Sequence, residues 1–156
     1  MPTLTITCGL PGCGKTTYAR AWVAENPATR SRSNRDDLGI LMHGGRFYSL
    51  TALSKDTERA ITNVQFAQIR TLLLMGRDVI CDDTNLNPEV VDRLRNLAAW
   101  EGAGLELVDM RDVPLDTVLA RNAQRGGTAA FVPEEVIRGI WDRYVADRDQ
   151  PAEVSA

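Results

Sequence analysis

The sequence predicts an α/β fold, in which a parallel sheet of about four strands is covered by helices on both faces. Short apolar segments typical of strands alternate along the chain with longer segments of helical periodicity, and this order is typical of parallel sheets. A chain of 156 residues has the size of one domain. We therefore expect a single domain over residues 1–150, followed by a C-terminal tail over residues 151–156.

Three strands are predicted from apolar and β-branched runs. Residues 3–7 (TLTIT) alternate and are rich in β-branched side chains, which favours a strand. Residues 78–81 (DVIC) form a short apolar run typical of a buried parallel strand, and residues 105–110 form the third. A further short strand is expected just before the NRDD segment, residues 34–37.

Helical periodicity, together with start and stop signals, marks the segments between these strands. The predicted helices span residues 15–25, 37–43, 51–75, 88–101, 115–124 and 133–146. The longest repeats at three- and four-residue steps through Ala60, Val64, Ala67, Thr71 and Leu74. Asn87 and Pro88 supply a cap and a first-turn proline for the fourth helix. The last helix has an apolar stripe that contains Ile137, Ile140, Trp141 and Tyr144.

Composition limits the possible functions. The formal net charge of −3 argues against a protein that coats nucleic acid non-specifically. The longest apolar runs are too short to span a bilayer, and the N-terminus lacks the features of a secretory signal. Cys8, Cys13 and Cys81 lack zinc-ligand spacing, so we expect reduced thiols. We expect a cytoplasmic protein with no membrane partner, and the sequence makes no prediction of its oligomeric state.

The segment GLPGCGKT, residues 9–16, matches the phosphate-binding motif G-x-x-x-x-G-K-[ST] in full. Its glycines permit positive φ angles and allow backbone N–H groups to surround a phosphate chain. The helix that follows directs the positive end of its dipole toward the same anion. The motif also follows a predicted strand and precedes a predicted helix, as this mechanism requires. We therefore predict that it binds a nucleoside triphosphate.

Individual residues of this loop have separate expected roles. Lys15 would contact the β- and γ-phosphates, and the Thr16 hydroxyl would ligate Mg²⁺. The loop and first-turn residues expected to bind the nucleotide are Gly9, Pro11, Gly12, Cys13, Gly14, Lys15, Thr16 and Thr17.

Two groups of acids follow the motif. A kinase needs a carboxylate that accepts the proton of the attacking hydroxyl, and Asp36 or Asp37 could be that base. Their spacing equally suits two acids at a helix N-terminus, so both interpretations stay open on spacing alone. Asp82 and Asp83 end a predicted strand at the sheet edge where α/β proteins bind ligands. Asp83, ahead of Asp82, is expected to orient the metal or its water shell or to hold the acceptor; a turn that caps the next helix is the alternative.

Arg121 and Arg125 lie four residues apart, on one face of a predicted helix that ends at Gly126 and Gly127. Such a helix suits a lid that closes over the triphosphate, where the guanidinium groups would offset charge on the transferred phosphoryl group. A solvent-exposed pair with no such role is the alternative.

The ordered segments GLPGCGKTTYAR, NRDD, DTNLNPE and RNAQRG, followed by an amphipathic helix, resemble the kinase domain of the bacteriophage polynucleotide kinase/phosphatase family. The resemblance covers residues 4 to about 145. It implies a P-loop kinase fold with a helical lid, and Mg²⁺-dependent transfer of the ATP γ-phosphate to a 5′-hydroxyl end of DNA or RNA. It also implies that Asp36 is the general base, that Asp83 is a second essential acid, and that Arg125, with Arg121 beside it, is the lid arginine. The residues expected to bind the acceptor are Arg35, Asp36, Asp83, Thr84 and Asn85.

The chain departs from this family in two respects. It has no DxDGT-type phosphatase motif, so we expect no phosphatase domain. The family commonly has an arginine three residues after the base, where it helps to bind the acceptor phosphate, whereas this chain has Gly39; Arg35 or Arg46 could compensate. Three alternatives therefore stay open: a kinase for a hydroxymethyl-pyrimidine base within DNA, such as 5-hydroxymethyluracil, a nucleoside or other small-molecule kinase, and a nucleotide-dependent binding module without enzymatic activity.

Overall fold

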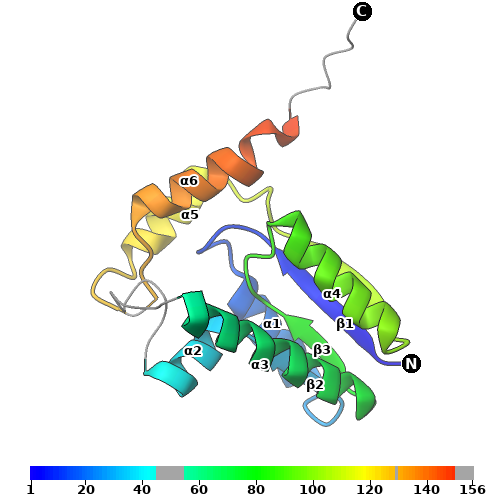
Figure 1. The fold of residues 1–156 in the computed structure, drawn as a ribbon. Helices are drawn as coiled ribbons and strands as arrows, with labels where there is room; N and C mark the ends of the chain where they lie inside the picture. The colour runs from blue at the N-terminus through cyan, green and yellow to red at the C-terminus, as the bar shows by residue number, and fades with distance from the viewer. Residues whose placement is uncertain (45–54, 129, 150–156) are drawn as a thin grey trace, which may run out of the picture.

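The computed structural model describes residues 1–44, 55–128 and 130–149, and these residues contain a four-stranded parallel sheet (Figure 1). The strands are β1 (Thr3–Cys8), β2 (Arg30–Ser33), β3 (Asp78–Cys81) and β4 (Gly104–Asp109), in the spatial order β2-β3-β1-β4. All three strand pairs are parallel. The predicted α/β class is confirmed, including the short strand expected before the NRDD segment.

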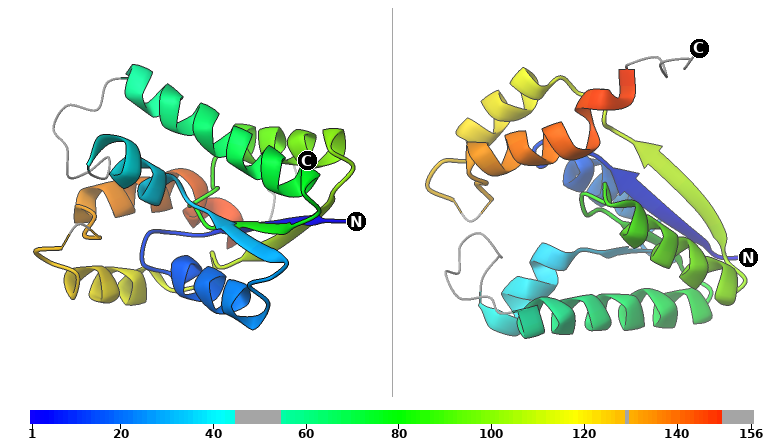
Figure 2. Two further views of the ribbon diagram at one scale, coloured as in Figure 1. Left: turned by 90° about the horizontal axis from the view of Figure 1, so that it is seen from below. Right: turned by 45° about the horizontal axis from the view of Figure 1, so that its top comes forward.

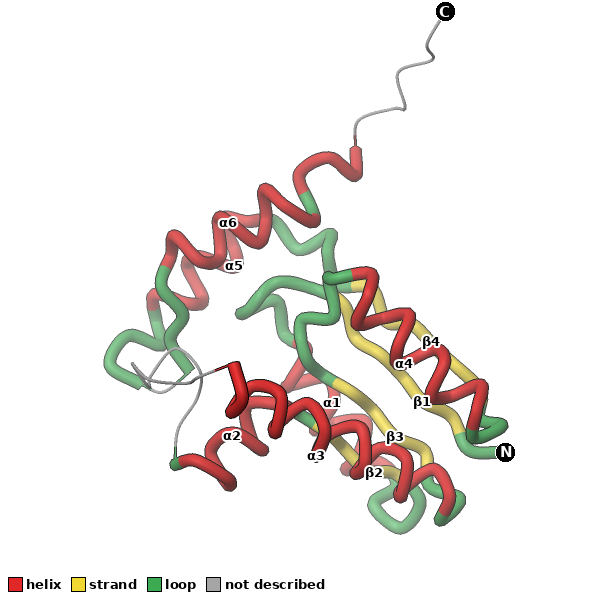
Figure 3. Tube along the Cα trace, viewed as in Figure 1, coloured by secondary structure: helices red, strands yellow, loops and turns green. Residues whose placement is uncertain are grey.

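Within the described residues, six α-helices connect or follow these strands. They are α1 (Lys15–Glu25), α2 (Arg35–His43), α3 (Lys55–Leu74), α4 (Pro88–Trp100), α5 (Leu115–Ala123) and α6 (Glu134–Tyr144), followed by the 3₁₀ helix η2 (Ala146–Asp149). Figure 2 shows α1 on one face of the sheet and α3 with α4 on the other. The tube in Figure 3 shows α5 and α6 side by side beyond the carboxyl ends of the strands. Residues 51–54 of the predicted third helix, Gly45 and Arg46, and the predicted tail at residues 151–156 lie outside the described residues.

The main core lies between the sheet and the pair α3–α4. Leu4 and Ile6 of β1 are fully buried and pack with Ile69 of α3 and Leu94 of α4. A second apolar cluster joins the loop after β1 to the helices at the carboxyl ends of the strands, through Leu10, Cys13, Val118 and Ile137. The same cluster receives Ile140, Trp141 and Tyr144, so the predicted stripe of α6 is confirmed. None of the helices in the described parts of the chain is long and apolar enough to cross a membrane.

Two predicted helices differ from the structure in detail. The buried face of α3 consists of Ile61, Gln65, Ile69 and Leu73, whereas Val64 and Leu74 of the predicted repeat are 40% and 65% exposed. A glutamine in the middle of the buried stripe interrupts its apolar pattern, which is why the neighbouring stripe looked more regular. Helix α2 begins at Arg35 and not at residue 37, because the Asn34 side chain accepts a hydrogen bond from the backbone N–H of Asp37 (3.1 Å).

The packing of α3 makes a first testable prediction. Ile69→Ala should lower the free energy of unfolding by about 2–5 kcal/mol, because it opens a cavity at a fully buried position between the sheet and α3. Leu74→Ala, on the exposed side of the same helix, is the matched control and should change it by less than about 0.5 kcal/mol. Urea unfolding measures both values, and equal losses would contradict the observed orientation of α3.

Candidate active site

The loop between β1 and α1, residues 9–14, has the backbone geometry of a phosphate cradle. Gly12 and Gly14 have φ angles of 92° and 112°, which side-chain-bearing residues rarely adopt. A Cβ at Gly12 would lie 3.2 Å from the Val118 carbonyl oxygen of α5, so the close approach of α5 also requires glycine there. A Cβ at Gly14 would meet no described atom within 4 Å. The loop therefore packs against α5 on one side and leaves space beside Gly14 and the start of α1.

The N-terminus of α1 carries a positive partial charge that neither a side-chain cap nor a first-turn acid offsets. Gly14 is its cap residue, no side chain caps the helix, and its first turn contains no acidic residue. Helix α2 differs, because Asn34 caps it and its first turn contains Asp36 and Asp37. The first N–H groups of any α-helix lack partners within the helix. The start of α1 therefore suits an anionic ligand such as a phosphate group.

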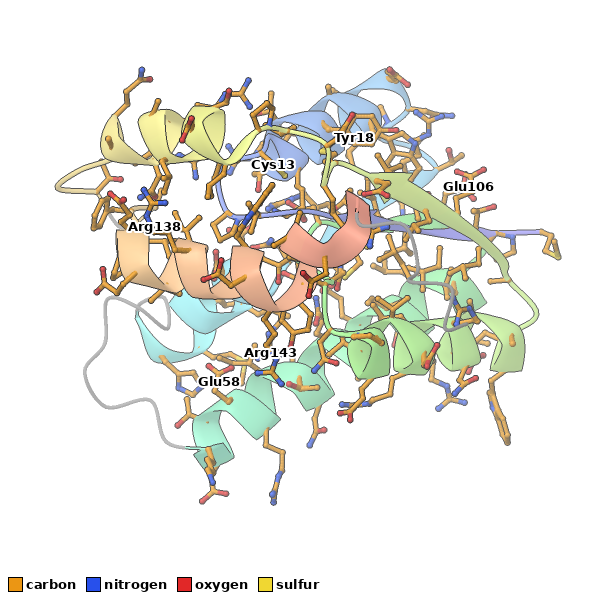
Figure 4. All side chains as sticks on the ribbon, turned by 90° about the horizontal axis from the view of Figure 1, so that it is seen from above. Cys13, Tyr18, Glu58, Glu106, Arg138 and Arg143 are labelled. Carbon is orange, nitrogen blue, oxygen red and sulfur yellow. The ribbon has the colours of Figure 1, made fainter. Side chains whose placement is uncertain are left out.

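Lys15 is buried within the same loop. Its Nζ donates hydrogen bonds to the carbonyl oxygens of Gly9 (2.9 Å) and Leu10 (2.7 Å) and lies 3.6 Å from the Cys13 sulfur. Burial lowers the pKa of the Lys15 ammonium below its ordinary value, although Cys13 and the carboxylates of Asp83 and Asp82 oppose that shift. Figure 4 shows Cys13 in this loop, and its side chain packs in the cluster that includes Val118 of α5. Lys15 thus places a cation at the base of the cradle.

Asp83, just after β3, receives hydrogen bonds on both carboxylate oxygens. Its Oδ1 accepts from the backbone N–H of Arg35 (2.9 Å) and from the Asn34 side chain (3.2 Å). Its Oδ2 accepts from Gln65 Nε2 of α3 and from the Cys81 thiol (3.4 Å). Burial raises the pKa of the Asp83 carboxyl, and the hydrogen bonds from Arg35 and Gln65 partly offset this effect. One carboxylate therefore connects β3, the start of α2 and the middle of α3.

These contacts bear on how the site could hold a metal ion. A carboxylate offers about four lone-pair positions, and four donors already surround that of Asp83. Within the described residues, no group of three or more His, Cys, Asp or Glu side chains could hold a metal ion. Mg²⁺ usually keeps several water ligands and takes few from the protein. The donor set therefore fits a hydrated ion, which the Thr16 hydroxyl would hold together with the phosphates of a nucleotide, while Asp83 would act through its neighbours.

The predicted base lies in the first turn of α2. Asp36 is half-buried there and directly follows Arg35, whose backbone Asp83 holds. The Arg35 guanidinium points to α3, where it bonds the Glu58 carboxylate (2.6 Å) and the Thr62 hydroxyl (2.6 Å). Figure 4 labels Glu58 on that helix. Gly39 is buried within α2. Arg35, expected to bind the acceptor, thus ties α2 to α3.

Thr84 and Asn85, also expected at the acceptor, connect the ends of β1 and β3. The Thr84 carbonyl oxygen accepts from the Gly9 backbone N–H (3.0 Å). The Asn85 side chain is buried and donates to the carbonyl oxygens of Thr7 (2.9 Å) and Cys81 (3.2 Å). Asn85 also has a φ of 44°, in the left-handed region that asparagine tolerates. These two residues therefore hold the phosphate loop against the strand that carries the acids.

The predicted lid arginines lie on and just after α5. Arg121 Nη1 donates to the Cys13 carbonyl oxygen (3.3 Å), so its guanidinium reaches the phosphate loop. Arg125 is half-buried in the turn that follows α5. The buried side chain of Asn122 exchanges two hydrogen bonds with the backbone of Val132, at 2.7 and 3.0 Å, and so closes the connection between α5 and α6. This pair fixes the turn that carries Arg125.

Sequence reasoning did not identify three residues that organise the site: Arg32, Gln65 and Asn122. Gln65 could have been found from its spacing, because it lies four residues from both Ile61 and Ile69. These three residues share the buried face of α3. Asn122 lies inside the RNAQRG segment, between the two arginines that drew attention. Arg32 had no signal, because its partners Asp37 and Asp82 are set by the tertiary fold.

Comparison with known proteins relates this site to a family. A model of the AAA domain family matches residues 4–151. The chain is similar to a protein of Autographa californica nuclear polyhedrosis virus that is named for bifunctional polynucleotide kinase and RNA ligase activity. The two are 30% identical over 141 residues, which cover 85% of this chain and 20% of the viral protein.

Solved structures support the same relationship. A chain in the structure of the Pnkp1/Rnl/Hen1 RNA repair complex matches with a TM-score of 0.77 and 25% identity, over 96% of this chain and 46% of that one. A gluconokinase from Sinorhizobium meliloti 1021 matches with a TM-score of 0.59 and 19% identity, over 96% of this chain and 78% of that one, which shows a shared fold alone. The chain thus has the P-loop kinase fold, and it spans about one fifth of the viral relative and less than half of the RNA repair chain.

The raised pKa of the Asp83 carboxyl predicts how the free energy of unfolding depends on pH. A carboxyl that binds its proton more tightly in the folded than in the unfolded chain contributes stability at low pH, and this contribution is lost as pH rises through the raised pKa. The free energy of unfolding of the unmodified protein, minus that of Asp83→Asn, should therefore increase as pH falls from 7 toward 4. Urea unfolding at each pH measures the difference. Asp92→Asn, at an exposed carboxylate, is the control, and a difference that stays flat for Asp83→Asn contradicts the prediction.

Proposed function

The chain belongs to the AAA domain family, and we propose that it is an ATP-dependent polynucleotide kinase that transfers the γ-phosphate to a 5′-hydroxyl end of DNA or RNA. The observation that carries this proposal is the link from Asp83 to the backbone of Arg35. It places the first turn of α2, with Asp36, at the sheet edge from which the phosphate loop and Lys15 also emerge. The polynucleotide kinase name of the viral relative supports the choice of acceptor.

The phosphate loop would bind the triphosphate of ATP. Backbone N–H groups at the start of α1 would face the phosphate oxygens, and Lys15 would exchange its contacts with Gly9 and Leu10 for the β- and γ-phosphates. Pro11, Cys13 and Thr17 complete the proposed binding surface of the loop. Mg²⁺, held by the Thr16 hydroxyl and the nucleotide, would neutralise charge on the phosphate oxygens.

Two side chains would act on the transferred group. Asp36 would accept the proton of the attacking hydroxyl, which makes that oxygen a better nucleophile as it approaches the γ-phosphate. Arg125 would approach the opposite side from the lid and offset the negative charge that develops on the phosphoryl oxygens. Arg121, which already contacts the loop at Cys13, would hold the lid near the triphosphate. We propose that residues 1–150 form one domain that performs this reaction in the cytoplasm.

The contacts of the Arg35 guanidinium with α3 favour a second class of acceptor. Its guanidinium is paired with Glu58 and Thr62, and Gly39 supplies no side-chain cation on α2. An acceptor whose hydroxyl is not flanked by an end phosphate would need no such cation. A hydroxymethyl group on a pyrimidine base turned out of the DNA stack is one acceptor of this kind. A nucleoside or another small molecule is the other.

An acceptor panel tests the function. Labelled ATP is supplied with a 5′-hydroxyl oligonucleotide, with end-blocked DNA that contains 5-hydroxymethyluracil, and with free nucleosides. We expect label on the 5′-hydroxyl strand, and label on the end-blocked DNA or on the nucleosides alone would replace the proposal with the corresponding alternative. Asp36→Asn should retain ATP binding and lose at least about 100-fold in kcat, because general-base catalysis contributes about that much. Near-normal turnover of Asp36→Asn would exclude it as the base.

The lid arginine makes a separate prediction. Arg125→Ala should lower kcat by about 10³-fold, within the range for arginines that contact a transferred phosphoryl group, while binding of a non-hydrolysable ATP analogue weakens much less. Arg138→Ala, which removes an exposed arginine from the neighbouring helix α6, is the matched control and should leave both values unchanged. If Arg125→Ala reduces analogue affinity alone, Arg125 binds the nucleotide without contributing to the transfer step.

A further inference from the structure

Arg32, in β2, lies between two carboxylates that belong to different parts of the site. Its Nη2 donates to Asp82 Oδ2 at 2.9 Å, and its Nε lies 2.8 Å from Asp82 Oδ1 without an aligned hydrogen bond. Its Nη1 donates to Asp37 Oδ2. Asp82 directly follows β3, and Asp37 lies in the first turn of α2. One guanidinium group therefore connects the end of β3 to the helix that carries Asp36.

Stability alone does not account for this arrangement. The Asp82 side chain is fully buried and that of Arg32 is 16% exposed, so both charges have lost most of their contact with water. The attraction within a buried ion pair roughly balances the cost of removing its charges from water, and apolar replacements are often equally stable. The third member, Asp37, is 45% exposed and adds little stability at such an exposure. Its connection to Arg32 instead restrains the direction of the first turn of α2.

The contacts of α2 show how that restraint would act. Successive residues of an α-helix are separated by about 100° around its axis, so Arg35 and Asp37 point about 200° apart. Arg35 is fixed to Glu58 of α3, and Asp37 is fixed to Arg32 of β2. The first turn is thus held from two nearly opposite sides. Asp36 lies between these two residues, in the turn that both contacts hold.

Arginine suits this role for a specific chemical reason. Its planar group carries five N–H donors in a fixed arrangement, so it can engage two carboxylates at once. A lysine at the same position would keep a positive charge for Asp82 but would present a single ammonium point. Lysine would therefore satisfy the buried acid without fixing the relative positions of Asp82 and Asp37.

We propose that Arg32 is a positioning residue for phosphoryl transfer, which through Asp37 sets the direction of Asp36 against the bound nucleotide. The inference rests on the proposed kinase function. The role of Arg32 would be indirect, because its guanidinium is engaged by Asp82 and Asp37. Displacement of a reacting group by about 1 Å can cost on the order of 100-fold in rate, so loss of this restraint should be visible in kcat.

The main test is Asp37→Asn, which breaks the exposed end of the bridge and leaves the buried Arg32–Asp82 pair intact. We expect kcat to fall by about tenfold or more, with KM for ATP within about twofold and the melting temperature nearly unchanged. The pH of half-maximal kcat should stay constant, whereas a shift of that pH that accounts for the whole loss would show that Asp37 acts as a charge near the base and would overturn the inference. Glu25→Gln is the matched control. It removes the exposed carboxylate that pairs with Arg30, and Arg30 lies on the same strand as Arg32.

A double-mutant cycle with Arg32→Lys completes the experiment. If the two residues act through one bridge, Asp37→Asn should cost little further kcat in the Arg32→Lys protein, whereas additive losses would overturn the inference. Should Arg32→Lys not fold, Asp37→Glu replaces it and should recover most of the kcat lost in Asp37→Asn; no recovery is then the contrary result. If the unmodified protein is active and Asp37→Asn has a normal kcat, the inference about Arg32 is overturned but the proposed kinase function is not. An unmodified protein that phosphorylates no acceptor of the panel overturns the proposed function as well.

Discussion

The hydrogen bonds to the Asp83 carboxylate are the contacts on which the rest of the site depends. They join the strand that carries the acids, the first turn of α2 and the centre of α3 through one group. The carboxylate is held in a partly buried position where its own pKa is raised, so it is costly to keep ionised. Donors from three segments partly offset that cost, and this couples the position of α2 to the ionisation of a single group.

The two helix N-termini at this edge of the sheet differ in their capping residues and in their charge. The start of α1 has neither cap nor acid, so its partial positive charge is available to an anion. The start of α2 is capped by Asn34 and carries two acids, one of which is paired with Arg32. A phosphate group would therefore be attracted to α1 and not to α2. Under the proposed function, this asymmetry would separate a side for the triphosphate donor from a side where a proton is accepted.

The sequence predicted the parts of the molecule that are local in the chain. The strand before the phosphate loop, the loop and the helix after it lie within residues 3–25, and backbone preferences alone mark them. The strand at residues 78–81 and the start of α4 were equally clear, because Pro88 follows the capping residue Asn87. The buried face of α3 was not clear from the sequence, because it contains Gln65, which bonds Asp83 and does not join the apolar core. A polar residue with a distant partner defeats a pattern built on hydrophobicity.

The acceptor side of the site is non-local, and this explains why its chemistry is the hardest to predict. Asp83 meets Arg35 across 48 positions of the chain, and Arg32 meets Asp82 across 50. A motif can show that an arginine is present, but it does not show which carboxylate that arginine will contact. An arginine that is already paired with a carboxylate is less available to bind a phosphate. The sequence makes Arg35 a candidate ligand of the acceptor, and the tertiary fold pairs its guanidinium with Glu58 of α3. The phosphate loop can be recognised from a short motif, whereas the pairing of the cations near Asp36 depends on the tertiary fold.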